Sequence, residues 1–517
     1  RHVLAPVRSR LDYLARIGLD YLTLDRPSRS LSAGESRRVA LTSALGSGLV
    51  NTLYVLDEPS IGLHPRDVGR LIEVVLGLVD VGNSLVVVEH DEDIIRSADH
   101  LVDIGPGAGQ EGGRVVFEGT PAAIVNSPES VTGSFLAGRL KVDIPKTRRT
   151  PSGEIRLHGA SGHNLKDIDV AIHLGVLCVV TGVSGSGKST LVEETLYPAL
   201  RRRVANEPLP SLPFRELTVD GKLDDAVLVD QSTIGRSPRS NPVTYLGAFD
   251  EIRKTFAASH EAKSRKYTAS TFSFNVQGGR CSTCEGNGQL VVDMQFLADV
   301  TMRCPDCMGH RYRPEVLEVQ YRGKSIADVL DLTAREASGF FRHRPKVQAR
   351  LRPLLDVVLD YLRLGQPAST LSGGEAQRLK LASYLSSTPG AMARAQAGPK
   401  TLFLLDEPTT GLHPADTLKL VEALESLLVL GHSLLVVEHD PSIMARADWI
   451  IDLGPEGGGQ GGRIVADGTP EAVAKSGTAT GTVIAKALSR GSAQGRRAAP
   501  APVGPSSTLP HGGGGLG

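Results

Sequence analysis

One short stretch has the residue types and spacing of a phosphate-binding loop. It fits the pattern GxxxxGK[ST] at every fixed position, with Gly182, Val183, Ser184, Gly185, Ser186, Gly187, Lys188 and Ser189. The glycines let consecutive backbone N–H groups turn toward a phosphate chain. Lys188 would reach the β- and γ-phosphates, and the Ser189 hydroxyl would bind Mg²⁺. The alternative is a Gly/Ser turn before a surface helix, which a complete match disfavours.

Flanking segments predict the elements that would position this loop. An apolar run from Gly175 to Val180 predicts a buried strand before it, and Leu191 to Leu200 predicts a helix after it. The N-terminus of that helix would add about half a positive charge where the phosphates lie. The chemistry predicted for this part of the chain is therefore nucleotide binding.

A series of motifs near the start of the chain recurs near its end. Each copy has an LSxGE segment, a predicted buried strand that ends in Asp-Glu-Pro, the tetrapeptide Gly-Leu-His-Pro and the segment Val-Val-Glu-His-Asp. Asp57 and Asp406 are 349 positions apart, as are His90 and His439. Repetition of this extent indicates an ancient duplication, and the alternating strands and helices predict a parallel α/β core.

These motifs, taken in order, resemble those of ABC-type ATPases. The resemblance implies that Asp406 holds the Mg²⁺ shell together with Ser189, and that Glu407 polarises the attacking water as general base. It implies further that His439 is the switch histidine that contacts the γ-phosphate. Gln231 is the candidate for the glutamine that senses Mg²⁺ and the lytic water. Taken singly, an Asp-Glu pair at a strand end is more often a cap or a solvated turn.

Two CxxC pairs have the spacing of a tetrahedral metal site. The ligands would be Cys281, Cys284, Cys304 and Cys307, with nineteen residues between the inner two. This is close to the CxxC-x₁₅₋₂₀-CxxC spacing of Cys₄ zinc sites, which are structural because no coordination position is open. Zinc capture would supply folding free energy on the order of 10 kcal/mol. A redox-active or disulfide role is the alternative, and the fifth cysteine, Cys178, is expected to be a buried thiol.

The phosphate loop, the signature, the zinc module and the duplication together resemble the UvrA family, the damage-recognition ATPases of the bacterial excinuclease. Further motifs of that family lie at residues 235–242, 272–276 and 278–281. The resemblance implies an ATP-, Mg²⁺- and zinc-dependent homodimer that binds distorted duplex DNA without reading base sequence, delivers it to a UvrB-type partner and has no membrane association. A drug-resistance relative is an alternative, and a transporter ATPase is disfavoured by the fused cassettes and the zinc insert.

Basic and aromatic residues are interleaved in and around the region between the phosphate loop and the second LSGGE segment. Candidate DNA-phosphate contacts are Arg236, Arg239, Arg265, Lys266 and Arg280. Candidate stacking partners among them are Tyr245, Phe249, Phe256 and Tyr267. A solvated basic face is the alternative, and the family resemblance favours DNA.

The first half departs from the family pattern in two ways. It has neither a phosphate loop nor the glutamine, and the module that binds UvrB in the family is expected to be missing with them. Ala33 stands where the signature usually has glycine. The opening residue Arg1, in place of methionine, favours a fragment over a native short protein.

ABC-type sites are composite, because the phosphate loop of one cassette meets the signature of the other. The resemblance therefore implies at most one functional ATP site, whose second side would be formed by Ser32, Gly34 and Glu35 of the first half. Asp57, Glu58, His90 and the second signature would be left without a nucleotide. An inactive portion of a repair ATPase is the alternative.

Composition predicts a cytoplasmic protein of several domains. The 517 residues exceed one core, 57 Lys+Arg balance 57 Asp+Glu, and the chain has no run of eighteen apolar residues. The predicted fold is α/β, with two ABC-type cassettes, the first incomplete, and a zinc-bearing α+β insertion in the second. The expected segments are a first cassette at 1–140, a linker with solvated charges at 141–153, the second cassette at 154–230 and 346–485, the inserted DNA-binding and zinc module at 231–345, and a disordered tail at 486–517.

Overall fold

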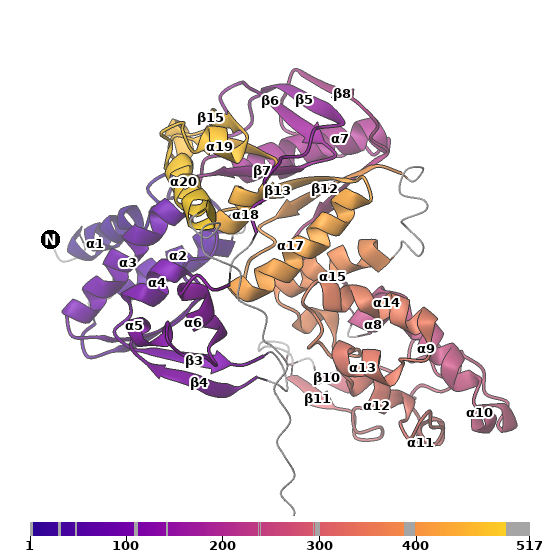
Figure 1. The fold of residues 1–517 in the computed structure, drawn as a ribbon. Helices are drawn as coiled ribbons and strands as arrows, with labels where there is room; N and C mark the ends of the chain where they lie inside the picture. The colour runs from indigo at the N-terminus through magenta and orange to yellow at the C-terminus, as the bar shows by residue number, and fades with distance from the viewer. Residues whose placement is uncertain are drawn as a thin grey trace, which may run out of the picture.

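The computed structural model describes residues 4–492 apart from short segments within that range. The segments left out are 29–30, 32, 47–48, 108–111, 141–142, 236, 238, 293, 295–299 and 387–398. Figure 1 shows the first half of the chain, in indigo and purple, beside the second half, whose large sheet lies in the upper middle of the view. Within the described ranges, no helix is both long and apolar enough to cross a membrane.

A six-stranded sheet forms the centre of the second half, in the order β15-β14-β7-β13-β12-β9. Its strands are β7 (Leu177–Gly182), β9 (Asp225–Val229), β12 (Thr401–Asp406), β13 (Ser433–Val437), β14 (Trp449–Gly454) and β15 (Arg463–Gly468). Neighbours pair in parallel except β14 and β15. Strands β7, β12 and β13 are continuous buried apolar runs, as a sheet covered on both faces requires. The carboxyl ends of all the strands except β15 therefore meet at one edge.

One face of this sheet is covered by the segment that follows the phosphate loop. The π-helix η3 (Thr190–Leu196) continues as α7 (Tyr197–Val204), where the sequence predicted one ordinary helix. Within η3, the Thr195 hydroxyl donates to the carbonyl oxygen of Thr190 at 2.7 Å. An antiparallel sheet in the order β6-β5-β8 completes this cover, with β5 (Gly153–Ala160), β6 (Ile168–Leu174) and β8 (Glu216–Asp220).

The inserted region and the C-terminal helices build the rest of the second half. The insertion contains α8 (Pro242–Tyr245), α9 (Ala248–Ala257), α10 (His260–Ser264), the hairpin β10 (Gln289–Val292) and β11 (Val300–Arg303), α11 (Pro314–Leu317), α12 (Ile326–Asp331), α13 (Ala334–Phe340) and α14 (Pro345–Asp356). After it come α15 (Gly373–Ser386), α17 (Pro414–Val429), α18 (Pro441–Arg446), α19 (Pro470–Val473) and α20 (Ala479–Ser492). One continuous core joins the insertion to the second face of the large sheet.

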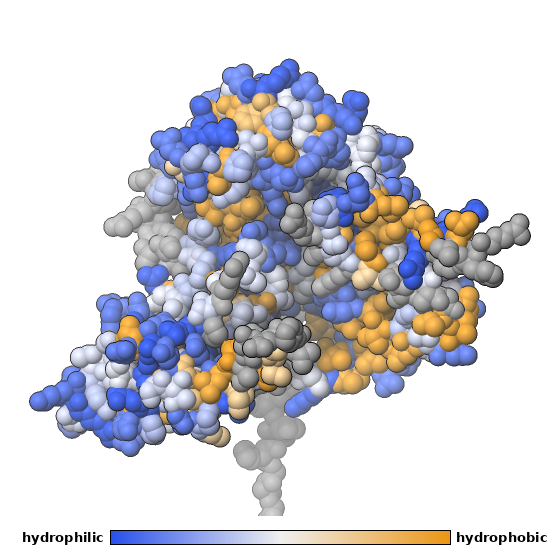
Figure 2. All heavy atoms as spheres, turned by 180° about the vertical axis from the view of Figure 1, so that it is seen from behind, coloured by the Kyte–Doolittle hydropathy of each residue, from blue (hydrophilic) through white to orange (hydrophobic). Residues whose placement is uncertain are grey.

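The first half repeats part of this architecture on a smaller scale. Its elements are α1 (Leu4–Arg16), α2 (Ala33–Leu45), the parallel pair β1 (Leu53–Asp57) and β2 (Ser84–Val88), α3 (Pro65–Asp80), α4 (Glu92–Ser97), the antiparallel pair β3 (Leu101–Gly105) and β4 (Arg114–Gly119), α5 (Pro121–Ile124) and α6 (Val131–Leu136). Strand β1 corresponds to β12, but its Leu53 and Val55 are 60% and 66% exposed. Figure 2 shows hydrophobic residues gathered on this side of the molecule.

The segment between the two halves is anchored by its arginines. Arg148 donates to the carbonyl oxygens of Ala445 and Ala447 at 2.9 and 2.8 Å. Arg149 forms an ion pair with Asp448 at 3.1 Å. The expectation that these linker charges are solvated is therefore wrong for both residues. The predicted tail begins inside α20, and residues 493–517 lie outside the described part of the chain.

Candidate nucleotide site and metal centre

The glycine-rich segment 182–189 joins the end of β7 to the start of η3. Gly182 has a φ of 133°, and an ideal Cβ there would lie 2.0 Å from the carbonyl oxygen of Leu453, so only glycine fits. The buried Lys188 donates from Nζ to the carbonyl oxygens of Gly182 and Val183, both at 3.0 Å. Burial lowers the pKa of Lys188 to about 8, against the opposing charges of nearby carboxylates.

Strand β12 delivers two carboxylates to the edge of the sheet beside this loop. Asp406 ends the strand, and Glu407 follows in the left-handed region with a φ of 44°. The N–H of Glu407 donates to Val437 at 2.9 Å, which helps to hold this strained conformation. His439 Nε2 lies 3.5 Å from Glu407 Oε1. Burial opposes ionisation of Glu407, but the interactions with His439 outweigh it and lower the pKa of this carboxyl.

Asp406 and Glu407 therefore have opposite electrostatic environments. Burial raises the pKa of Asp406 well above its usual value, and the neighbouring charges of Glu407 and Glu193 raise it further. A buried carboxyl in such a setting favours a bound cation, which would compensate the charge. Together with the Ser189 hydroxyl at the start of η3, Asp406 offers the oxygen ligands that Mg²⁺ prefers.

Gln231 follows β9 at the same edge, and the structure places its side chain against the second signature. An ideal Cβ on Gly373 would lie 3.2 Å from Gln231 Oε1. A different glutamine, which sequence reasoning missed, connects the strand ends: Gln377 donates to the carbonyl oxygens of Val229 and Asp406 at 2.8 and 2.7 Å. The repeat could not indicate Gln377, because an arginine stands at that place in the first signature. The role of Gln231 in sensing Mg²⁺ and water stays a prediction.

The first half closes over the phosphate loop. The Ser184 hydroxyl donates to the carbonyl oxygen of Gly62 at 3.3 Å. An ideal Cβ on Gly185 would lie 2.6 Å from the ring of Tyr21, so the loop and this tyrosine are in close contact. The Tyr21 hydroxyl donates to Glu35 Oε1 at 2.6 Å. The first signature is thereby connected to the phosphate loop of the second half, although Ser32 lies outside the described residues.

Sequence reasoning also missed Tyr21, for which the duplication carries a signal. Tyr21 stands fourteen positions before Glu35, and Tyr361 stands fourteen positions before Glu375. The Tyr361 hydroxyl donates to Glu375 Oε1 at the same distance, 2.6 Å. A search for residues that keep their spacing to both signatures would therefore have found this tyrosine.

Buried polar atoms around the loop fit an anionic ligand. Ser186 Oγ is buried without a hydrogen-bond partner among the described residues, as are Nε and Nη1 of Arg38 in the first signature helix. Arg38 acts electrostatically on Glu407, which places its charge near the carboxylate edge. A hydroxyl, a guanidinium and the ammonium of Lys188 at the start of a helix form a donor set suited to a phosphate chain.

The first half has a corresponding pair of carboxylates and a histidine at the end of β1, which we call its carboxylate edge. Asp57 ends β1, Glu58 follows with a φ of 45°, and His90 Nε2 lies 3.5 Å from Glu58 Oε1. An ideal Cβ on Gly411 of the second half would lie 3.6 Å from this carboxylate. The sequence has one match to GxxxxGK[ST], and it faces the other edge. The His90 side chain is 37% exposed, against 8% for His439.

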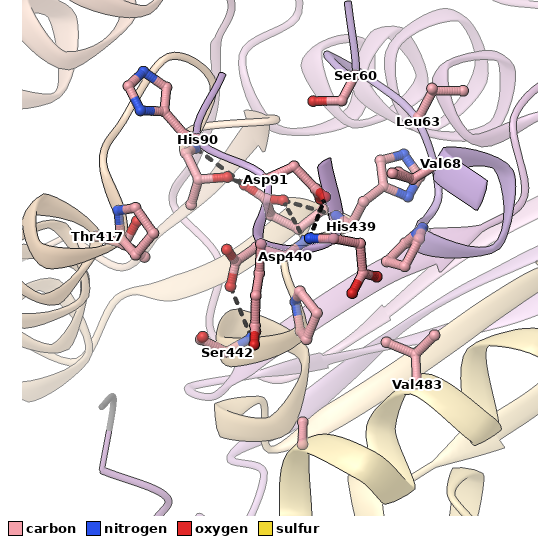
Figure 3. Close-up of a pocket in the computed structure, with 18 of the residues that line it drawn as sticks. Ser60, Leu63, Val68, His90, Asp91, Thr417, His439, Asp440, Ser442 and Val483 are labelled. Carbon is pink, nitrogen blue, oxygen red and sulfur yellow. Dashed lines mark hydrogen bonds between the residues drawn. The ribbon is translucent and has the colours of Figure 1, made fainter. Parts of the chain in front are cut away.

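A cavity of about 910 Å³ lies between the two carboxylate edges. Figure 3 shows His90 and Asp91 of the first half and His439 and Asp440 of the second around it, with Val483 of α20 below. Glu438 accepts the backbone N–H groups of His439 and Asp440 at 2.7 and 3.0 Å, which fixes the segment after β13. Glu89 accepts the N–H groups of His90 and Asp91 in the same way, at 2.9 and 3.3 Å, so both histidine segments are held by hydrogen bonds at the boundary between the halves.

The four cysteines of the two CxxC pairs come together at the base of the β10–β11 hairpin. Their sulfur atoms all lie within 4.8 Å of one another and are buried. Cys281 and Cys304 are 3.9 Å apart, and Cys284 and Cys307 are 3.5 Å apart. This geometry fits one tetrahedral metal ion. Cys178 lies apart from them in β7, where burial raises the pKa of its thiol to about 12 and makes it inert.

Three of the predicted DNA contacts are paired with carboxylates. Arg239 and Arg280 both approach Glu285, at 3.6 and 3.5 Å. Arg265 forms an ion pair with Glu318 at 2.6 Å. The carboxylates of these pairs are exposed and the arginines are partly buried, so solvent weakens the pairs and contact with DNA stays a prediction for the three arginines.

The remaining basic and aromatic candidates divide by burial. Lys266 is exposed, and Arg236 lies outside the described residues. Phe249 and Phe256 are 2% and 0% exposed and pack in the core of the insertion. With Ile252 they form the buried face of α9 at helical spacing. The prediction that these two rings stack on bases is therefore wrong.

Known proteins similar to this chain match almost all of it. UvrABC system protein A of Methanothermobacter thermautotrophicus is 52% identical over 489 residues, which are 94% of this chain and 50% of the relative. UvrABC system protein A of Thermus thermophilus is 51% identical over 487 residues, with the same two shares. That of Escherichia coli K12 is 48% identical over 476 residues, or 92% and 50%. The chain thus spans about half the length of these relatives; no family model matches it.

Solved structures support the fold. The crystal structure of UvrA2 from Deinococcus radiodurans matches with a TM-score of 0.85 at 48% identity, covering 92% of this chain and 57% of that one. A model of ribosome-bound archaeal Pelota and ABCE1 matches with a TM-score of 0.51 at 19% identity, and this likeness concerns the fold alone. The fold is α/β with ABC-type ATPase cassettes, as the sequence predicted.

Proposed function

We infer that this chain, a relative of UvrABC system protein A over almost all of its length, is an ABC-type ATPase of nucleotide excision repair. It binds damaged duplex DNA by its distortion rather than its base sequence and passes the site to a UvrB-type partner. The identity of 52% over 94% of the chain supports this context. The site described above would supply the residues for ATP hydrolysis.

Binding and charge neutralisation fall to the phosphate loop and the end of β12. Lys188 and the backbone N–H groups of 182–189 would bind the phosphate chain, and Ser189 and Asp406 would hold Mg²⁺. The metal ion, when bound, neutralises charge that develops on the β- and γ-phosphates. The raised pKa of Asp406 agrees with a carboxylate built to face a cation.

Glu407, the carboxylate that follows Asp406, would carry out proton transfer. Glu407 stays ionised because its interactions with His439 outweigh burial, so it can take a proton from the attacking water as general base. His439 would contact the γ-phosphate, and Gln231 would orient the water and sense Mg²⁺. The first signature, with Ser32, Gly34 and Glu35, would complete the site from the opposite half.

One observation carries the proposal of a single composite ATP site. The phosphate loop touches the first half at two places, through the Ser184 hydroxyl on Gly62 and through Gly185 on Tyr21. Tyr21 is hydrogen-bonded to Glu35 of the first signature. These contacts support a nucleotide site that forms between the phosphate loop of the second half and the signature segment of the first half.

The other parts of the proposal concern metal and partners. The four clustered cysteines would hold zinc as a structural ion that orders the β10–β11 hairpin. Lys266 and the arginines at 236, 239, 265 and 280 would contact DNA phosphates. The likeness to the longer relatives supports the proposal of a homodimer in the cytoplasm that delivers DNA to a UvrB-type protein.

The experiment is ATP turnover by the zinc-replete chain, without DNA, with intact duplex and with a duplex that carries a bulky adduct. We expect turnover that responds to the adduct and close to one ATP bound per chain. Lys188→Ala serves as control and should lose both ATP binding and ATP turnover. Binding of two ATP per chain rejects the single site. A folded, metal-bound chain without turnover would show that this chain is an inactive portion of a repair ATPase.

A further inference from the structure

A histidine outside the ATPase motifs reaches from the first half toward the site. His64 caps α3, where its Nδ1 accepts the N–H of Arg66 at 3.2 Å. Because Nδ1 is an acceptor, the hydrogen is on Nε2, which lies 3.2 Å from Thr480 Oγ1. The Thr480 hydroxyl donates in turn to Asp452 Oδ1 at 2.8 Å. Burial lowers the pKa of His64 to about 2, so the ring is neutral. Nε2 of His64 therefore donates to the Thr480 hydroxyl, which donates to Asp452.

The ring of His64 stands edge-on to the ring of His439. The two ring centroids are 6.0 Å apart and the planes meet at 87°. His439 is buried, and apart from the 3.5 Å contact of its Nε2 with Glu407 Oε1 its ring nitrogens have no hydrogen-bond partner among the described residues. Packing therefore contributes to the orientation of His439, and His64 is one of the residues of the first half that pack against it. Figure 3 shows His439 close to Leu63 and Val68, which flank the segment that carries His64.

The duplication repeats this arrangement. His413 caps α17 by accepting the N–H of Ala415 at 3.1 Å, and its Nε2 lies 3.1 Å from Thr132 Oγ1. Thr132 donates to Asp103 at 3.0 Å. His413 stands edge-on to His90, with centroids 6.1 Å apart and planes at 88°. Each copy of the repeat thus has an Asp and a Thr that form a hydrogen-bonded series with a capping histidine from the other half, and the ring of that capping histidine contacts the ring of a second histidine.

We propose that His64 is a positioning residue for ATP hydrolysis, which holds the switch histidine His439, and through it Glu407, in the geometry needed for turnover. Thr480 and Asp452 of the second half hold His64 in turn. The first half thereby controls the catalytic carboxylate through a residue outside the phosphate loop and the metal ligands. This inference rests on the ATPase function proposed above and adds a residue to it.

The matched variants His64→Asn and His413→Asn test the proposal. Asparagine can still cap a helix, but it lacks the ring and the Nε2 hydrogen. For His64→Asn we expect kcat to fall about 10- to 100-fold with the KM for ATP nearly unchanged, because misplacement alters the reacting geometry and not nucleotide binding. His413→Asn should leave both constants at the wild-type level. Equal losses in the two variants, or no loss in His64→Asn, would overturn the proposal.

A double-mutant cycle separates positioning from a general structural effect. In a His439→Gln background, His64→Asn should cause no further loss of kcat, because its effect acts through the ring that has been removed. Additive losses contradict the proposal. Thr480→Val should lower kcat in the same direction as His64→Asn but less, and Thr132→Val is its control. If His64→Asn does not fold, which thermal unfolding will show, Thr480→Val and His64→Gln take its place in the cycle.

NMR of the histidine side chains, which does not need ATP turnover, separates this inference from the proposed function. If the wild-type chain does not hydrolyse ATP, the proposed function fails, and NMR of histidine-labelled protein then decides the positioning. His64→Asn should move the imidazole signals of His439 and leave those of His90, and His413→Asn should do the reverse. Unchanged His439 signals in His64→Asn would overturn the inference.

Discussion

The two halves hold the same carboxylate and histidine in the same geometry but in different surroundings. Glu58 and Glu407 have φ angles of 45° and 44°, and each carboxylate lies 3.5 Å from its histidine. Strand β12 is buried between β9 and β13, whereas β1 pairs with β2 alone among the described strands. Local sequence therefore sets the geometry of the edge, even where no phosphate loop faces it.

The two histidines differ in their electrostatic environment, which depends on how deeply the surrounding elements bury each of them. The hydrogen bond that the His90 ring donates to the Glu58 carboxylate outweighs partial burial and raises the pKa of His90. Burial, with the charge of Lys188, lowers the pKa of His439. The same side chain beside the same carboxylate thus has opposite pKa shifts. Chemistry at a duplicated edge depends on the strands and loop that enclose it.

Removal of the metal is expected to have the largest effect, and only in the second half, which has all the cysteines. Chelation, or Cys284→Ser, should disorder the β10–β11 hairpin, because metal capture by four cysteines contributes on the order of 10 kcal/mol. Hydrogen exchange of the hairpin and metal analysis measure this. Cys178→Ser, outside the cluster, should keep its metal. A hairpin that stays protected after complete chelation contradicts a structural ion.

The next effect should distinguish the two carboxylate edges directly. Glu407→Gln is expected to lower ATP turnover by about 10²- to 10⁴-fold while nucleotide affinity is retained, because an amide cannot accept the proton of water. Glu58→Gln is the matched control and should leave turnover unchanged. Steady-state hydrolysis and equilibrium ATP binding check both variants. Similar losses in the two would mean that both edges hydrolyse ATP.

A smaller effect should distinguish the two signatures. An ideal Cβ on Gly34 would lie 2.4 Å from the carbonyl oxygen of Ile61, and one on Gly374 would lie 2.8 Å from that of Thr410. Gly34→Ala should cost about 1–3 kcal/mol of unfolding free energy and slow turnover, because it displaces the segment that closes over the phosphate loop. Gly374→Ala should cost less and leave turnover near normal. Denaturant unfolding and hydrolysis rates measure this, and the reverse order would refute the comparison.

The smallest effect concerns pH. The raised pKa of His90 gives stability that is present below about pH 6.5 and is lost as the pH rises through its folded value. The lowered pKa of His439 gives stability that is present above about pH 6.5 and is lost as the pH falls. His439→Gln should therefore flatten the acid side of the stability profile, and His90→Gln the alkaline side.

The magnitude of these slopes is small. The limit is about 1.4 kcal/mol per pH unit for His439 and less for His90, whose partly exposed ring is screened by solvent. Urea unfolding between pH 5 and 8 measures the slopes, and NMR titration assigns them. Parallel profiles for the two variants would show that the halves have the same electrostatics.

Contiguous motifs made much of the molecule predictable from sequence. The strand-loop-helix around Lys188 and the strand that ends at Asp406 are each encoded within a few residues, and the fold of ABC-type cassettes follows from them. The metal cluster was predictable for the same reason, since two short CxxC pairs need only one hairpin to meet. The duplication then assigned the corresponding strands to the first half.

Contacts that depend on docking of the halves could not be predicted. Tyr21 reaches Gly185 only when the first half lies on the second, and the buried charge of Arg38 depends on the same contact. The stacking roles of Phe249 and Phe256 were wrong because an amphipathic helix also places aromatic and basic residues near one another in sequence. Burial, which decides between the two, belongs to tertiary structure.

The open face of β1 and β2 has a consequence for handling the purified protein. Leu53, Val55, Val86 and Val88 are between 49% and 66% exposed, whereas Leu402 and Leu404 in the corresponding strand β12 pack under η3. With 57 basic and 57 acidic residues, the chain has no net charge to keep molecules apart. Light scattering should rise with protein concentration and with salt, and mild detergent or Val55→Lys should suppress it.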